Sequence, residues 1–204
     1  MAKLKTALLV VAMSLLSVGP VRSNETPANF REINITSDSE PGWLPSAELS
    51  DAAEHDARAY LTARDSGEIA KAYAMLADIN RANMPYERYS GDQTAIHDKL
   101  GDVIERRFLK VTWTKNPRNA PALGIYVAID LAGRFTKADR FCGYMILYQP
   151  LSGKPFGVMR EEENFIENAQ ADSIAKTHGP AEVEKVWTQL SSHCPNYPGV
   201  NARP

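Results

Sequence analysis

Hydrophobic and polar residues alternate with a period of two in four segments of the chain, a pattern typical of strands with one buried face. Short links separate these segments, so neighbouring strands are expected to run antiparallel. Prolines in the first link and a Ser-Gly pair in the last support this reading, because both are typical of turns. The four predicted strands are Phe108–Lys115, Leu123–Phe135, Arg140–Gln149 and Pro155–Arg160.

The alternation also predicts which strand positions are buried. In the second segment, Val127 and Ile129 share an apolar face, whereas Tyr126 and Asp130 share the opposite one. The third segment is apolar on both faces, as expected of a central strand. The residues predicted to pack against helices are Trp113, Val127, Ile129, Met145 and Leu147.

Three helical patterns precede the predicted sheet. Leu44-Pro45-Ser46 opens the first, with Pro45 tolerated in its first turn, and the second covers Glu68–Asp78. Asn83–Tyr89 is predicted to be a loop. Ser90 and Gln93 then form a capping-box pattern, which predicts the start of a third helix. Its apolar side would carry Ile96, Leu100, Val103 and Ile104.

The chain beyond the sheet is predicted to hold one further helix. Arg160–Asn164 is strongly charged, which favours a strand end and a solvated turn. A sharper alternative is that Arg160 pairs with Asp130 or with a neighbouring glutamate across the sheet. Gly179-Pro180 begins the last helix, whose buried side would carry Val183, Val186, Trp187 and Leu190.

These elements predict an α+β protein, with N-terminal helices packed on a curved antiparallel four-stranded meander and a C-terminal helix. A single α+β domain is expected over residues 45–194. Residues 24–44 form a polar stretch expected to be a flexible leader, with a short strand within Phe30–Thr36 as an alternative because Ile33 and Ile35 share a face. Residues 195–204 form a tail.

The N-terminus has the features of a signal peptide over residues 1–23. Lys3 and Lys5 precede an apolar core at Ala7–Val18, and Val21-Arg22-Ser23 supplies small residues for cleavage near Ser23. The apolar core is too short to be a membrane anchor, and no second long apolar segment follows. The sequence therefore predicts an exported protein, periplasmic or secreted, without a membrane span.

Charge and cysteine content narrow the possible chemistry. The net charge is −2 and both signs are interspersed, which argues against a nucleic-acid partner. Cys142 and Cys194 are predicted to form a disulfide, because an exported chain enters an oxidising compartment. Two unpaired buried thiols are the alternative. A metal site is disfavoured because the cysteines lack ligand spacing, and no cofactor is predicted.

Several short segments carry a resemblance to known folds. They are Tyr60-Leu61, Asp65-Ser66-Gly67, Ala72–Leu76, Trp113, Gly124–Val127, Arg134-Phe135 and Phe156–Arg160. With them, the segment Ala57–Ile166 resembles the cone of nuclear-transport-factor-2-like (cystatin-like) domains. It resembles more closely a family of small exported proteobacterial proteins classed as a domain of unknown function. These motifs are mainly packing positions, so the resemblance implies a fold rather than an activity.

Cone folds of this kind resemble ketosteroid isomerase and scytalone dehydratase in outline, enzymes with acid–base groups inside the cone. The candidate ligand-binding residues here are Tyr126 and Asp130 on one strand, and Tyr144 and Tyr148 on its neighbour. No catalytic motif of those enzymes matches residue by residue. The histidines have no ligand spacing and are expected to be solvated; they are His55, His97, His178 and His193.

Two functions follow from these observations. The first is a non-catalytic binding or interaction module whose partner is an unknown protein or a small apolar ligand. The second is a small-molecule acid–base enzyme with a pocket inside the cone. A cavity containing a desolvated Asp130 or Tyr126 would favour the enzyme.

Overall fold

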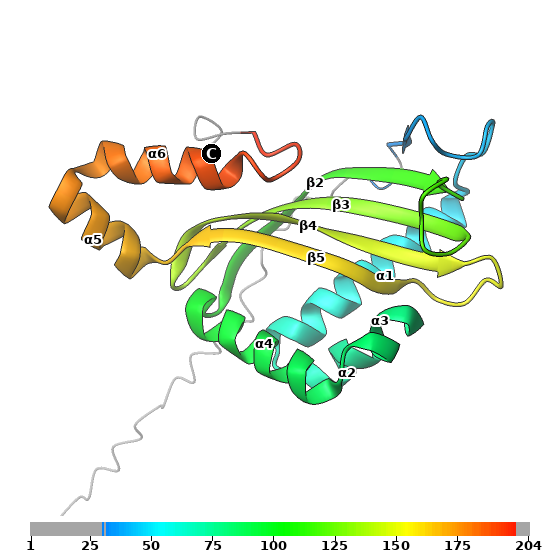
Figure 1. Ribbon diagram of the computed structural model, residues 1–204, viewed down its shortest axis with the longest axis horizontal. Helices are drawn as coiled ribbons and strands as arrows, with labels where there is room; N and C mark the ends of the chain where they lie inside the picture. The colour runs from blue at the N-terminus through cyan, green and yellow to red at the C-terminus, as the bar shows by residue number, and fades with distance from the viewer. Residues whose placement is uncertain (1–29, 31, 199–204) are drawn as a thin grey trace, which may run out of the picture.

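A five-stranded sheet forms the centre of the computed structural model, which describes residues 30 and 32–198 (Figure 1). The predicted signal peptide and its cleavage site lie outside the described residues. The strand order is β1-β2-β3-β4-β5. The strands are β1 (Asn34–Ile35), β2 (Val103–Lys115), β3 (Gly124–Phe135), β4 (Ala138–Pro150) and β5 (Gly157–Ile166).

The meander of β2 to β5 is antiparallel, as the short links predict. The prediction of four strands is wrong by one, because β1 adds to β2 in parallel, with Asn34 opposite Thr112. The alternative of a short strand within Phe30–Thr36 is confirmed for Asn34–Ile35. The segment expected to be a flexible leader therefore supplies an edge strand, and its Phe30 packs against Phe108 with ring centroids 5.7 Å apart.

Six helices accompany the sheet within the described residues. Four of them lie on one face, whereas α6 lies over the opposite face near one end (Figure 1). They are α1 (Ala47–Asp65), α2 (Ile69–Ala74), α3 (Asp78–Asn83), α4 (Tyr86–Leu100), α5 (Asn168–His178) and α6 (Pro180–Ser191). None of the helices in this part of the chain is both long and apolar enough to cross a membrane.

The helix boundaries differ from the prediction at α4. Pro85 is extended and directly precedes the helix, so Ser90 lies inside it rather than at its cap. The helix stops at Gly101, whose φ of 70° is in the left-handed region that favours glycine. An added Cβ there would lie 2.1 Å from Thr136 Oγ1. Val103 and Ile104 therefore belong to β2 instead of the helix.

Several further segments differ from the prediction. β5 continues through Arg160–Asn164, so the predicted turn there is wrong. The helix predicted over Glu68–Asp78 ends at Ala74, and the loop predicted over Asn83–Tyr89 is largely replaced by the start of α4. α3 and α5 were not predicted, and within them only Ala171 is buried. Helices with so few buried apolar positions give little periodic signal.

The sheet separates two hydrophobic clusters. On the side of α1 to α4, the five residues predicted to be buried (Trp113, Val127, Ile129, Met145 and Leu147) are fully buried. On the other side, α6 contributes Trp187 to a smaller cluster around Cys142 and Ile166. Side chains alternate between the faces of a strand, so β4 and β5 contribute residues to both clusters.

Candidate functional site

The four residues proposed for ligand binding lie on the sheet face opposite α1 to α4. Their strand neighbours Val127, Ile129, Met145 and Leu147 occupy the helix-facing side. A position between the helices and the sheet is therefore wrong for this set, because the period of two turns it outward. The set comprises Tyr126, Asp130, Tyr144 and Tyr148.

The structure brings these residues together in two cross-strand pairs, Tyr126 with Tyr148 and Asp130 with Tyr144. The first pair has ring centroids 5.0 Å apart. Both of its hydroxyls donate to backbone carbonyls, Tyr126 to Ala122 at 2.6 Å and Tyr148 to Leu123 at 2.9 Å. These hydroxyls therefore stabilise the ends of the strands.

The second pair binds neighbouring side chains. Asp130 accepts a hydrogen bond from Asn196 at 2.5 Å, and burial raises the pKa of its carboxyl. Tyr144 donates to Glu162 at 2.7 Å. Arg160 also bonds to Glu162, at 2.8 Å, and not to Asp130 as one alternative proposed.

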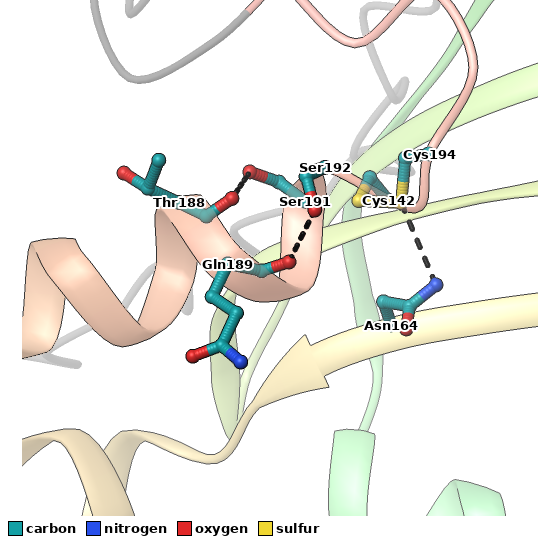
Figure 2. Close-up of a disulfide and its surroundings, with 7 residues drawn as sticks. All are labelled: Cys142, Asn164, Thr188, Gln189, Ser191, Ser192 and Cys194. Carbon is teal, nitrogen blue, oxygen red and sulfur yellow. Dashed lines mark hydrogen bonds between the residues drawn. A yellow bond between two sulfur atoms is a disulfide. The ribbon is translucent and has the colours of Figure 1, made fainter.

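The predicted disulfide between Cys142 and Cys194 is confirmed, with the two Cα atoms 5.9 Å apart (Figure 2). Asn164 Nδ2 on β5 lies 3.6 Å from the sulfur of Cys194. The bond holds the end of α6 against β4, and Tyr197 beyond it packs edge-on against Trp187. The disulfide therefore has a structural role on the outer face.

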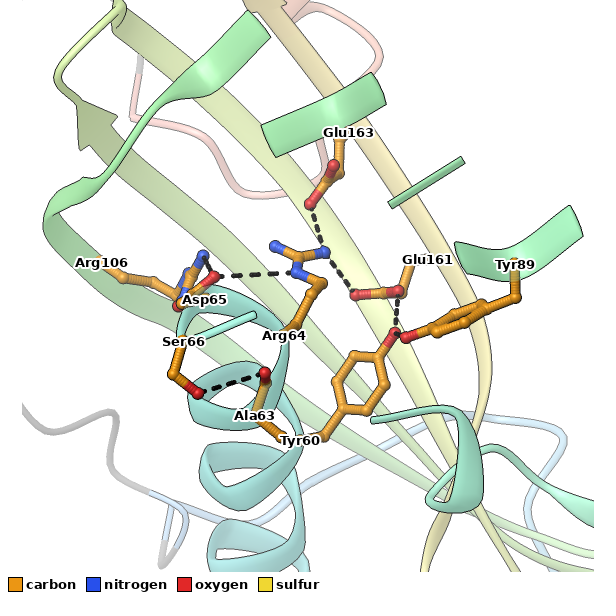
Figure 3. Close-up of polar contacts among 9 residues, drawn as sticks. All are labelled: Tyr60, Ala63, Arg64, Asp65, Ser66, Tyr89, Arg106, Glu161 and Glu163. Atoms are coloured by element: carbon orange, nitrogen blue, oxygen red, sulfur yellow. Dashed lines mark hydrogen bonds and ion pairs between the residues drawn. The ribbon is translucent and has the colours of Figure 1, made fainter. Parts of the chain in front are cut away.

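A buried ionic cluster lies on the other side of the sheet, where α1 ends (Figure 3). Tyr60 and Arg64 are one helical turn apart and so share a face of α1. Arg64 is only 6% exposed, and its Nη1 donates to Glu161 at 2.9 Å and to Glu163 at 2.7 Å. The two glutamates alternate on β5, which turns both side chains toward α1.

A tyrosine pair completes this cluster. Tyr60 donates to Glu161 Oε2 at 2.5 Å, and the hydroxyls of Tyr60 and Tyr89 are 3.0 Å apart. Since the single proton of Tyr60 is given to Glu161, Tyr89 is the donor to Tyr60. A second ion pair lies alongside, in which Arg106 binds Asp65 with its Nη2 3.0 Å from Oδ1.

Burial dominates the ionisation of the cluster. It raises the pKa of Glu161, and Glu163 adds to the rise while Arg64 opposes it. Burial also raises the pKa of Tyr60, and that of Tyr89 to about 12. For Arg64, burial acts against the charge, but Glu163 and Glu161 together hold its pKa well above the ordinary value. Glu161 is therefore the member of the cluster best suited to carry a proton.

A cleft of about 520 Å³ opens next to this cluster, between α4 and β5. Arg64, Glu161 and Glu163 lie at its polar end, and Asp92, Lys99 and Arg160 at exposed positions around it. Its volume is in the range of small-molecule sites. The apolar lining consists of Leu76, Met84, Ala95, Ile96, Val158, Met159 and Phe165.

A second cleft of similar volume, about 590 Å³, lies between α3 and the β4–β5 turn. Asp78 and Lys154 are exposed in this cleft and pair at 3.1 Å, and Asp78 also contacts the half-buried Arg81. Asp56 accepts from the backbone of Phe156 at 3.0 Å. The cleft beside Arg64 is the stronger candidate, because it alone of the two contains buried charges.

The side chains that could bind a metal ion are not clustered in the described part of the chain. No group of three or more His, Cys, Asp or Glu side chains there is arranged to hold a metal ion. His55, His97, His178 and His193 are all exposed.

Sequence reasoning missed the ionic cluster because its glutamates were read as a solvated turn. The available signal was their spacing. Met159, Glu161, Glu163 and Phe165 alternate along β5, so the two glutamates lie between apolar residues that share their face. Arg64 lies 97 positions from Glu161, so no local pattern links them.

Burial of Glu161 predicts a specific pH dependence of stability. Its pKa is raised above the ordinary 4.5, so the folded state keeps a proton that the unfolded state has released. The resulting stability is complete below pH 4.5 and is lost as the pH rises through the folded pKa. The free energy of unfolding of the wild type, relative to Glu161→Gln, should therefore fall with pH by up to about 1.4 kcal/mol per unit.

Urea unfolding from pH 4 to 8 measures this difference. Glu162→Gln is the control, because the hydrogen bonds from Tyr144 and Arg160 lower the pKa of Glu162 and reverse the sign. A wild-type-to-Glu161→Gln difference that does not change with pH would contradict the raised pKa.

Comparison with known proteins shows that part of the chain is similar to one family, and that family has no assigned activity. Residues 56–154 match the model of a family described as a protein of unknown function (DUF4019). No curated protein and no solved structure matches the chain. The matched segment contains Tyr60, Arg64, Tyr89 and Arg106, and it ends before β5 supplies Glu161 and Glu163. From α1 to the β4–β5 turn, the chain is thus similar to a family without an assigned function.

Proposed function

We propose that this protein is an exported binding module that holds a small, largely apolar molecule in the cleft between α4 and β5. The observation that supports it is the combination of apolar walls with a polar end made of buried side chains. Pockets with this composition bind through the apolar walls and orient the ligand through a few polar groups.

The arrangement of helices on one side of the meander also fits the proposed nuclear-transport-factor-2-like cone, whose interior would be this cleft. A cone of that kind leaves the ligand between the helices and the sheet. We therefore propose Arg64, Gln93, Glu161 and Glu163 as the ligand-binding residues, in place of the four residues on the outer face.

Export is supported by the Cys142–Cys194 disulfide, since such bonds persist in oxidising compartments. N-terminal sequencing of the protein from cells tests it. A start within a few residues of Asn24 agrees with export, and an intact Met1 in all of the protein would contradict it.

The binding proposal is tested by exposing the immobilised protein to a small-molecule extract of the cell envelope and identifying retained compounds by mass spectrometry. Ala95→Trp, which places an indole in the cleft, should abolish the retention seen with the wild type. Thr94→Trp is the matched control, because Thr94 is its neighbour on α4 and, unlike Ala95, is not part of the cleft lining. Equal retention by both variants, or none by the wild type, would refute the proposal.

An acid–base enzyme is the second candidate, and the hydrogen-bonded series Tyr89, Tyr60 and Glu161 is the observation that favours it. A carboxyl with a raised pKa beside a cleft is suited to proton transfer. The retained compounds distinguish the two. Chemical change by the wild type but not by Glu161→Gln indicates the enzyme, and recovery unchanged indicates the binding module.

A further inference from the structure

The buried groups at the polar end of the cleft do not balance in charge. Arg106 pairs with Asp65, whose Oδ1 also lies 3.8 Å from Arg64 Nε, and Arg64 is the cation that Glu161 and Glu163 share. With both glutamates ionised, this group carries one excess negative charge, which either a proton on Glu161 or a bound cation neutralises. An uncompensated buried charge is costly, so the cluster is stabilised by any cation that reaches it.

Two buried oxygens at the same place have no hydrogen-bond partner among the described residues, Glu163 Oε2 and Gln93 Oε1. Gln93 is 8% exposed, and the side chain of Glu163 is 9% exposed. Both residues line the cleft. A buried acceptor without a donor is costly, so a ligand that donates a hydrogen bond there gains binding energy.

Both oxygens belong to side chains that line the cleft, and the terminal torsions of glutamate and glutamine are broad, so reorienting these groups costs little. The other Glu163 oxygen accepts a hydrogen bond from Arg64 at 2.7 Å. Both available groups are acceptors, which favours a ligand with N–H donors.

We propose that the cleft binds a small organic cation, an ammonium or amidinium group on an apolar body, with the charged group between Glu163 and Gln93. The inference rests on the proposed function and specifies its ligand class. An anionic ligand is disfavoured because Arg64 is committed to two carboxylates. The apolar body would lie against Ile96, Val158 and Phe165.

The test uses three probes of equal length, hexylammonium, 1-hexanol and hexanoate, titrated into ¹⁵N-labelled protein made from the complete chain. Amide shifts of Ala95–Ile96 and Val158–Glu163 report the cleft. Hexylammonium should bind about tenfold more tightly than hexanol, as expected for one charge-assisted hydrogen bond, and hexanoate more weakly than either.

Glu163→Gln should remove the preference for hexylammonium, whereas Glu162→Gln should keep it, because Glu162 lies on the outer face bonded to Tyr144. Gln93→Met, which removes the other acceptor, should reduce the preference for hexylammonium. This second variant tests the proposal independently if Glu163→Gln does not fold.

The outcomes separate the two proposals. The cation proposal is wrong if hexanol binds in the cleft as tightly as hexylammonium. It is also wrong if the preference for hexylammonium is unchanged in both Glu163→Gln and Gln93→Met. Neither result contradicts the proposed binding function. Absence of all three probes from the cleft overturns both proposals.

Discussion

Replacing Arg64 by methionine is expected to lower the free energy of unfolding by about 3–5 kcal/mol at pH 7, because it leaves Glu161 and Glu163 buried without their cation. The guanidinium is 6% exposed and bonds to both carboxylates. Methionine keeps most of the volume, so the loss measures the charge rather than a cavity. Urea unfolding gives the value.

Two further variants make this prediction specific. Arg88→Met should change stability by less than about 1 kcal/mol, because Arg88 is 72% exposed and its pair with Asp92 is screened by solvent. Adding Glu163→Gln to Arg64→Met should recover part of the loss, since it removes one unpaired charge. Purely additive losses would show that Arg64 and Glu163 do not act as one cluster.

Removing the disulfide by replacing Cys142 and Cys194 with alanine is expected to cost about 4 kcal/mol, from the chain entropy of a loop that spans 52 positions. The loss should be local at first. α6 has 12 residues, which is short for an isolated helix, and it packs on the sheet mainly around Trp187 and Val183.

Hydrogen exchange tests this order of loss. In the double variant, the amides of α6 should exchange much faster while those of β3 stay protected. Thiol titration of the oxidised, unfolded wild type should find no free cysteine. Two free thiols in protein taken from cells would contradict the bond, and uniform loss of protection would contradict the local role.

The meander and its core could be predicted from the sequence because one face of each strand is uniformly apolar. Trp113, Ile129 and Leu147 show this, as all three are fully buried on the side of α1 to α4. The short links between the strands predicted that neighbouring strands run antiparallel. The disulfide followed from compartment and cysteine count, without geometry.

The ionic cluster could not be predicted because burial of charge depends on a partner distant in sequence. Glu163 next to solvent and Glu163 next to Arg64 give the same local pattern, and only the packing of α1 against β5 distinguishes them. The same argument explains Tyr126 and Asp130. The alternation showed correctly that they share a face, but polar character alone does not tell a pocket from an outer surface.

A crystal structure of the protein with hexylammonium bound tests the central claim most directly. The account predicts the probe in the cleft between α4 and β5, with its nitrogen about 2.7–3.2 Å from oxygens of Gln93 and Glu163. Its alkyl chain should lie against Ile96 and Phe165. An unoccupied cleft, or the probe bound instead beside Tyr126 and Asp130 on the outer face, would contradict it.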